Sequence, residues 1–224
     1  GLKDIAGRPL LAHVIERLRN VDRISSIVML TTNRSEDVPL KKLADAEGIE
    51  FFGFDGDVDD VTGRIQAGSK AFSADVLISV SGDCPLLDPE HINKLLDPVL
   101  ADDGDASFIP GNKYDSLHEG VGVFRAEAWE RLDAVSKEPK YREHPGFYWT
   151  EHPEFLRGAE VVPSPWSQRR GFRLSVDNLA DLTFMRAIYD RLYREGAIVS
   201  LRKVVELLDD EPDFSKKQIL LLGS

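Results

Sequence analysis

Short apolar runs that alternate with helical patterns constrain the fold of this chain more than any other feature. In the first hundred residues we expect strands at 27–30, 49–52 and 76–80, and helices at 9–18, 35–46, 62–72 and 88–96. The helical segments repeat apolar residues at spacings of three and four, whereas the strand candidates are continuous apolar runs. This rhythm is typical of a parallel sheet with helices on both faces. The sequence therefore predicts an α/β fold with a mostly parallel sheet.

The second half of the chain has a less regular pattern. We expect strands at 106–109, 120–124, 161–162 and 172–176, and helices at 126–135, 179–195 and 201–208. Residues 141–153 concentrate aromatic and histidine side chains without clean periodicity. With 224 residues, 42% of them hydrophobic, the chain is long enough for one full core. We therefore expect residues 1–224 to form a single domain.

The charge balance limits the partners. Charged residues make up 30% of the chain and the net charge is −11, which argues against nucleic acid or an anionic membrane. A small anion such as a nucleotide remains compatible with this charge, since local dipoles and a metal ion can overcome the overall sign. The single cysteine, Cys84, excludes a disulfide framework and favours a reducing, cytoplasmic setting. No apolar run approaches the roughly 18 residues that span a bilayer.

The predicted strand 76–80 stops at Ser81-Gly82-Asp83-Cys84-Pro85. Gly82 frees the backbone to turn, and Pro85 removes a donor and ends the ladder. Open α/β sheets bind their ligands at the carboxyl ends of parallel strands, so Asp83 is a candidate site residue. Asp177 follows the predicted strand 172–176 in the same way. The two carboxylates could share one Mg²⁺ ion; alternatively, each only caps the helix or turn that follows.

Other polar residues are weaker candidates. Asp57-Val58-Asp59-Asp60 resembles the Asp-x-Asp motif of metal-dependent glycosyltransferases, although a solvated turn whose last residue caps the next helix is favoured. Arg64 could reach a phosphate, and His144 could act as a base or bind a hydroxyl group. A histidine among aromatic residues is nevertheless more often structural. The chain has no Walker loop, no Gly-x-Gly-x-x-Gly after a strand and no Gly-x-Ser-x-Gly elbow. These absences argue against a P-loop NTPase, a nicotinamide enzyme and an α/β-hydrolase.

Five segments, in this order, carry a family resemblance. They are 4–11 (DIAGRPLL), 60–64 (DVTGR), 81–89 (SGDCPLLDP), 142–145 (REHP) with 152–154, and 174–178 (LSVDN) with 181–182. The order resembles the cytidylyltransferase family of the spore-coat polysaccharide biosynthesis type, which is related to the CMP-sialate and CMP-ketodeoxyoctonate synthetases. Each segment alone is a weak signal, but five in order at plausible separations are strong evidence.

The resemblance implies a Rossmann-like, three-layer α/β/α nucleotide-binding domain with a small projecting element at 105–160 that binds the acceptor and makes a homodimer. It also implies a reaction in which CTP and a sugar or sugar acid give a CMP-sugar and pyrophosphate, for surface polysaccharide biosynthesis. By the same resemblance, Asp83 and Asp177 would be catalytic and hold Mg²⁺. Arg8, Arg64, Ser81 and Gly82 would place the nucleotide, and Glu119, Arg142 and His144 would face the acceptor.

The sequence departs from the family at its start. The family begins with a central strand and a loop rich in Gly, Ser, Arg and Lys that cradles the triphosphate, whereas this sequence starts just past that point, at Gly1-Leu2-Lys3-Asp4. Losing that strand would expose two strand edges. Either an N-terminal piece is missing from this sequence or the protein is a truncated homologue, and in the second case we expect weak or absent catalysis. Two alternatives stay open: a nucleotide-sugar-dependent glycosyltransferase that uses Asp57-Val58-Asp59-Asp60, and a catalytically impaired nucleotide-binding homologue that has lost its phosphate loop.

Overall fold

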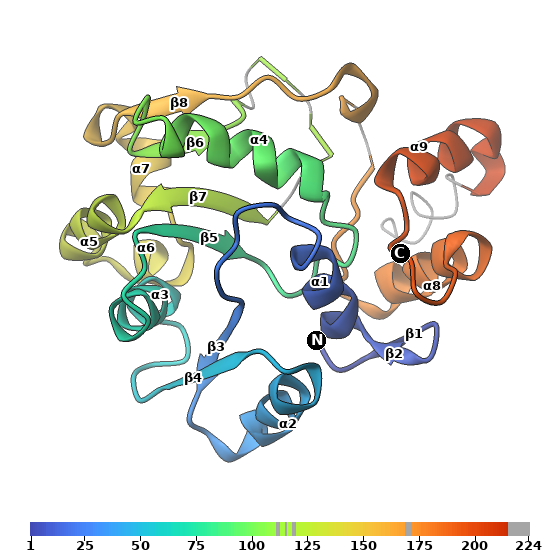
Figure 1. The fold of residues 1–224 in the computed structure, drawn as a ribbon, viewed down its shortest axis with the longest axis horizontal. Helices are drawn as coiled ribbons and strands as arrows, with labels where there is room; N and C mark the ends of the chain where they lie inside the picture. Colours follow the sequence, from blue (N-terminus) through green and yellow to red (C-terminus); the bar gives the residue numbers. More distant parts are fainter. Residues whose placement is uncertain (111–112, 115, 118–119, 169–171, 215–224) are drawn as a thin grey trace.

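The strands form a sheet in two parts (Figure 1). The computed structural model describes residues 1–110, 113–114, 116–117, 120–168 and 172–214. In one part, β3 (Val28–Thr32) pairs in parallel with β4 (Glu50–Phe54). The other part has the order β5 (Val76–Val80), β7 (Val121–Arg125), β6 (Ala106–Phe108) and β8 (Gly158–Glu160). Because β7 is antiparallel to both β5 and β6, and β8 is parallel to β6, only β7 runs against the other three.

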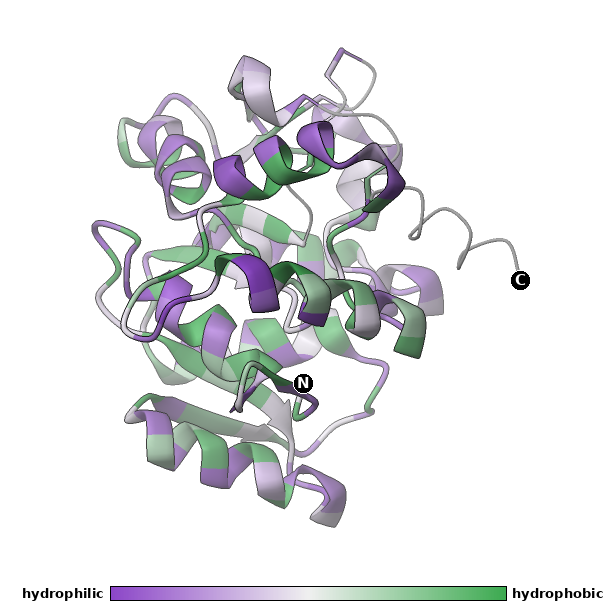
Figure 2. Ribbon diagram, turned by 90° about the vertical axis from the view of Figure 1, so that its right-hand side faces the viewer, coloured by the Kyte–Doolittle hydropathy of each residue, from purple (hydrophilic) through white to green (hydrophobic). Residues whose placement is uncertain are grey.

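Helices connect and cover these strands. In chain order they are α1 (Leu10–Leu18), α2 (Val38–Glu47), α3 (Val61–Ala71), α4 (Pro89–Leu100), α5 (Ala126–Val135), α6 (Pro139–Glu143), α7 (Phe147–Glu151), α8 (Leu179–Leu192) and α9 (Leu201–Asp210). Short 3-10 turns, η1 (Ser35–Asp37), η2 (Pro153–Phe155) and η3 (Pro165–Ser167), and a hairpin of β1 (Asp4–Ile5) and β2 (Arg8–Pro9) complete the chain. Apolar residues gather in the strands and on the inner helix faces (Figure 2).

Different helices pack on the two faces of strand β7. Successive strand residues point to opposite faces, and the buried Val123 and Phe124 belong to different core clusters. Val123 packs with α4 residues such as Leu95, and Phe124 packs with Ile65 of α3 and Trp129 of α5. Helices therefore cover both faces, and the three-layer α/β/α prediction is confirmed.

The predicted elements agree with the structure except near 160 and 175. Strand β5 and helix α5 begin and end at the predicted residues, but β8 ends at Glu160, so 161–162 is not a strand. The strand predicted at 172–176 is also wrong, since no strand is assigned there. Its Val176 N–H donates to Asp83 O at 2.9 Å. This segment crosses the loop after β5 rather than running beside a strand, so it makes a local contact instead of a ladder.

A cavity of about 910 Å³ separates the two parts of the sheet. Its lining includes residues 28–31 of β3 and 76–80 of β5, with apolar side chains of α1, α3 and α4 on either side. Among the described strands, β3 pairs only with β4, and β5 only with β7. The facing edges of β3 and β5 therefore lack strand partners. This agrees with the two exposed strand edges expected from the sequence.

The segment 105–160 contributes more to the sheet than its predicted projecting role implies. It supplies β6, β7 and β8 as well as α5, α6 and α7. Its role in a homodimer stays a prediction. In the part of the chain that the structure describes, no helix is both long and apolar enough to cross a membrane.

Candidate active site

The cavity between β3 and β5 brings together five of the residues selected from the sequence. Arg64, Ser81, Gly82, Asp83 and His144 all line it. Ser81 to Asp83 directly follow the carboxyl end of β5, and Thr31 lines the cavity at the carboxyl end of β3. Residues from α3, from the loop after β5 and from the segment after α6 thus line the same cavity, which reaches the carboxyl ends of β3 and β5, where open α/β sheets bind ligands.

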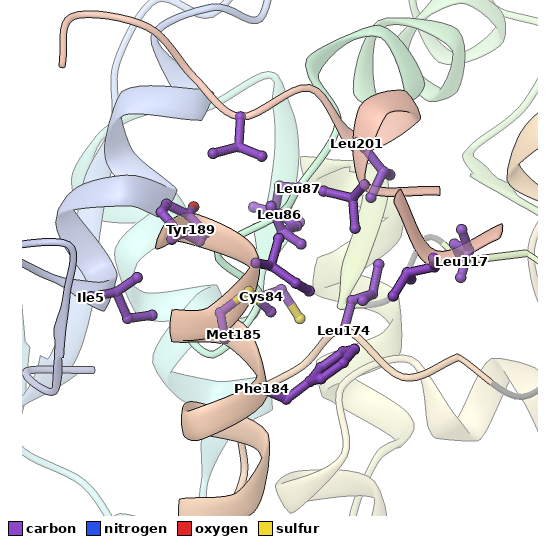
Figure 3. Close-up of a cluster of buried hydrophobic side chains, with 14 of the residues drawn as sticks. Ile5, Cys84, Leu86, Leu87, Leu117, Leu174, Phe184, Met185, Tyr189 and Leu201 are labelled. Atoms are coloured by element: carbon purple, nitrogen blue, oxygen red, sulfur yellow. The ribbon is translucent and has the colours of Figure 1, made fainter. Parts of the chain in front are cut away.

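The loop that carries Asp83 is fastened through its main-chain carbonyl groups. Val176 N–H donates to Asp83 O at 2.9 Å, and the buried Tyr189 hydroxyl donates to Pro85 O at 2.8 Å. The buried Arg17 guanidinium donates to Leu87 O. Cys84, Leu86 and Leu87 sit in a buried cluster with Met185 and Tyr189 of α8 (Figure 3). The half-buried Asp83 side chain is therefore held on a rigid support.

Gly120 packs tightly against the same loop. Its carbonyl accepts a hydrogen bond from Ser81 N at 2.8 Å. Its φ is +65°, and a Cβ there would lie 2.8 Å from Ser81 Cβ and 2.9 Å from Cys84 Sγ. A side chain would therefore be strained by both conformation and space. Glu119, predicted to face the acceptor, lies outside the described residues.

Arg64 is presented by the first turn of α3. The Asp60 carboxylate caps that helix by accepting from Gly63 N at 2.9 Å. Burial lowers the pKa of Arg64, while the nearby Asp37 and Asp60 carboxylates act in the opposite direction. A guanidinium in this position can neutralise a bound phosphate.

Asp37 was not selected from the sequence. Its carboxylate accepts hydrogen bonds from Thr31 Oγ1 at 2.7 Å and Thr32 N at 3.0 Å. A further bond from the Thr32 hydroxyl is the largest cause of its lowered pKa. The only sequence signal was two threonines at a strand end followed five residues later by an acidic residue, and this pattern is common in turns.

Asp177 adjoins the Asp83 loop through its neighbour Val176. Its carboxylate pairs with Arg173, and its N–H donates to the Asp181 carboxylate at 3.1 Å, beside the capping box of α8. In the described part of the chain, no group of three or more His, Cys, Asp or Glu is placed to hold a metal ion. Asp83 is among the residues that line the cavity, whereas Asp177 is not.

Two further predicted ligands lie away from the cavity. Arg8 pairs with Glu16 of α1 and, at 3.2 Å, with Glu47 of α2. Arg142 pairs with Asp60 and Asp133 at 2.6 Å each. Neither arginine is among the residues that line the cavity.

The Asp57–Asp60 run forms a capped turn. Asp57 Oδ1 accepts from Asp59 N at 3.0 Å, Asp57 O accepts from Asp60 N at 3.1 Å, and Asp60 caps α3. This geometry agrees with the favoured interpretation, a solvated turn that starts a helix.

Comparisons with known proteins identify relatives of this chain. A family model described as cytidylyltransferase matches residues 1–219. Spore coat polysaccharide biosynthesis protein SpsF of Bacillus subtilis is 25% identical over 227 residues, covering 97% of this chain and 90% of that protein.

Two solved structures share the fold. A cytidylyltransferase from Leptospira borgpetersenii superposes with a TM-score of 0.85 at 21% identity, over 95% of this chain and 88% of that one. CMP:2-keto-3-deoxy-manno-octonic acid synthetase complexed with CTP gives a TM-score of 0.62 at 18% identity, over 85% and 91%. With a family model that covers nearly its whole length, this chain belongs to the cytidylyltransferase family.

Proposed function

We propose that this protein transfers CMP from CTP to a hydroxyl group of a sugar or sugar acid, giving a CMP-sugar for surface polysaccharide biosynthesis. One observation carries the proposal: Arg64, Ser81, Asp83 and His144, from three separate segments, line one cavity at the carboxyl end of β5. Family membership and the named activities of the relatives support the same chemistry.

The reaction requires in-line displacement at the α-phosphorus. The acceptor hydroxyl oxygen forms a bond to that phosphorus while the bond to the oxygen bridging to the β-phosphorus breaks, and pyrophosphate leaves with the electron pair. The hydroxyl proton passes to a base, for which His144 at the cavity wall is our candidate. Arg64 offsets negative charge on the phosphates, and Ser81 and Gly82 place the nucleotide beside Asp83.

Asp83 and Asp177 would hold a Mg²⁺ ion. Their oxygen atoms suit this hard cation, and the two segments are joined by the Val176–Asp83 hydrogen bond. Arg173 neutralises Asp177 in the structure, so it would have to turn away from that carboxylate. When bound, the ion would neutralise charge that develops on the phosphates.

We also propose that a strand followed by a phosphate-binding loop fills the cavity between β3 and β5. The unpartnered strand edges and the apolar lining support this, because such edges normally find a partner. A loop at the carboxyl end of that strand would reach Arg64 and Asp83. We therefore expect full activity only from protein that includes such a segment.

The Asp83→Asn variant tests the catalytic proposal. Because it removes charge from the proposed metal ligand and keeps the side-chain shape, we expect CTP-dependent pyrophosphate release to fall at least about 100-fold, with unchanged circular dichroism. Asp97→Asn is the control, since Asp97 is exposed, forms a surface ion pair with Arg23 and is not among the residues that line the cavity. Undiminished activity in Asp83→Asn would refute the role of Asp83.

A thermal-shift comparison separates the remaining alternatives. We expect CTP to raise the melting temperature more than UDP- or GDP-sugars do. The opposite order would favour a nucleotide-sugar-dependent glycosyltransferase. Tight CTP binding without pyrophosphate release, under any acceptor tested, would favour a catalytically impaired homologue.

A further inference from the structure

Arg142 is the centre of an ionic junction between three helices. Its Nε and Nη2 atoms lie 2.7 and 2.6 Å from Asp60 Oδ1, at the start of α3. Its Nη1 atom lies 2.6 Å from Asp133 Oδ1 in α5. The same Nη1 donates to the carbonyls of Asp133 at 3.2 Å and Ser136 at 3.3 Å. All three nitrogen atoms of the guanidinium therefore already have protein partners.

We infer that Arg142 is a positioning residue that fixes the segment carrying His144 against the helix carrying Arg64. Arg142 lies in α6, two residues before His144, and Asp60 caps α3 four residues before Arg64. Both His144 and Arg64 line the cavity, but Arg142, Asp60 and Asp133 do not. The junction therefore acts on the acceptor and nucleotide sides of the site through their supporting helices.

Partial burial makes this junction stronger than a surface ion pair. The side chains of Arg142, Asp60 and Asp133 are only 22%, 25% and 28% exposed. One guanidinium contacts two carboxylates, and its planar fork suits such a geometry. Lysine, with its single ammonium group, cannot reproduce these directions.

The absence of a side chain at Gly63 leaves room for the Arg142 guanidinium. A Cβ at this position would overlap Arg142 Nη2 and would lie 2.5 Å from Asp60 Oδ2. Alanine forms helices more readily than glycine does, so the helix itself does not favour glycine here. The close approach of the guanidinium explains this glycine, and it links the 60–64 and 142–145 segments that stood apart in the sequence.

Uncharged contacts run alongside the junction. Thr62 Oγ1 donates to Tyr141 O at 2.7 Å, and Trp129 Nε1 donates to Thr62 O at 3.2 Å. These bonds join the same helices through other atoms. We therefore expect a variant without the ionic junction to remain folded but to hold His144 and Arg64 less firmly.

A kinetic comparison, which rests on the proposed function, tests the inference with Arg142→Gln, Asp60→Asn and Gly63→Ala. The Asn side chain still caps α3, so Asp60→Asn removes only the charge. We expect each variant to lower kcat about tenfold and to raise KM for both CTP and the acceptor. The Arg142→Gln/Asp60→Asn double variant should be no worse than either single one. Arg142→Lys should restore only part of the activity.

The matched control is Lys70→Met. It breaks the 2.7 Å Lys70–Glu130 pair, which also joins α3 to α5 but is exposed, and neither residue is among those that line the cavity. We expect wild-type kinetics from it. If Arg142→Gln raised only the acceptor KM while Asp60→Asn and Gly63→Ala behaved as wild type, Arg142 would be a substrate ligand and the inference would be wrong.

A stability measurement tests the junction without any turnover. In urea unfolding, the destabilisation of the Arg142→Gln/Asp60→Asn double variant should be smaller than the sum of the two single effects, because both remove the same interaction. Strict additivity would overturn the junction. Since this result does not depend on the substrate, it remains informative if the proposed reaction fails.

Discussion

At the residue scale, the loop after β5 is positioned by a side chain that carries no sequence signal. Tyr189 belongs to the buried face of α8, and its hydroxyl donates to Pro85 O. In the sequence it is one more apolar position of an amphipathic helix. The motif residues Ser81 to Asp83 could be predicted because they follow a strand, whereas Tyr189 could not, since only the packed fold brings it to them.

The Tyr189→Phe variant should lower kcat about tenfold while KM for CTP changes little, since the ring still packs and only the bond to the loop is lost. The free energy of unfolding should be about 1 kcal/mol lower than that of the wild type. Ser107→Ala is the control, because it removes an equally buried hydroxyl bond, to Leu95 O at 2.7 Å, which joins β6 to α4. Equal kcat losses in both variants would assign Tyr189 a general role in stability.

At the element scale, strands and helices with clear periodicity could be predicted to within a few residues. The exceptions were 161–162 and 172–176, and the second has the apolar pattern of a strand. Leu174 and Ser175 are indeed buried, but the segment packs over the loop after β5 instead of pairing with a strand. A sequence pattern reports that a side chain is buried and does not report whether a neighbouring strand edge is available.

The hydrogen bonds between Asp37 and the two threonines at the end of β3 predict that the stability of the protein depends on pH. Hydrogen bonds from the Thr32 and Thr31 hydroxyls lower the pKa of Asp37. Its ionised form therefore stabilises the fold above the pKa of the unfolded chain, and this stability is lost as pH falls through the lower folded-state pKa. Asp37→Asn should destabilise the protein at pH 7, and the difference from wild type should shrink in acid.

Urea unfolding at several pH values measures this difference. Asp45→Asn in α2, the helix that follows Asp37, is the control, because Asp45 is exposed and forms a surface pair with Lys41, which contributes little. A wild-type-to-Asp37→Asn difference that stays constant from pH 7 to strongly acidic pH would contradict the role assigned to the Asp37 carboxylate.

At the scale of the whole molecule, the main feature is the interruption of the sheet between β3 and β5. Strand β7 has partners on both edges, but among the described strands β3 and β5 have one partner each and face the cavity. Family membership was predictable because five motifs occur in order. The size of the cavity could not be predicted from the sequence, because it depends on how the helices that cover the two parts of the sheet pack.

Amide hydrogen exchange should reveal this interruption. In the chain of residues 1–224, we expect amides of β3 and β5 that face the cavity to exchange faster than those of β7, since they lack strand partners. The proposed strand, when joined to the chain, should slow their exchange. Equal protection of β5 and β7 in the 1–224 chain would contradict an open cavity.

The most direct test of the central claim is the fate of labelled CTP. Protein that includes any residues encoded before Gly1 is incubated with Mg²⁺, a panel of sugars and sugar acids, and CTP labelled at either the α- or the γ-phosphorus. Cytidylyl transfer predicts that the α-label appears in a sugar product and the γ-label only in pyrophosphate. A γ-label in the sugar, or no label in any sugar while CTP is consumed, would contradict it.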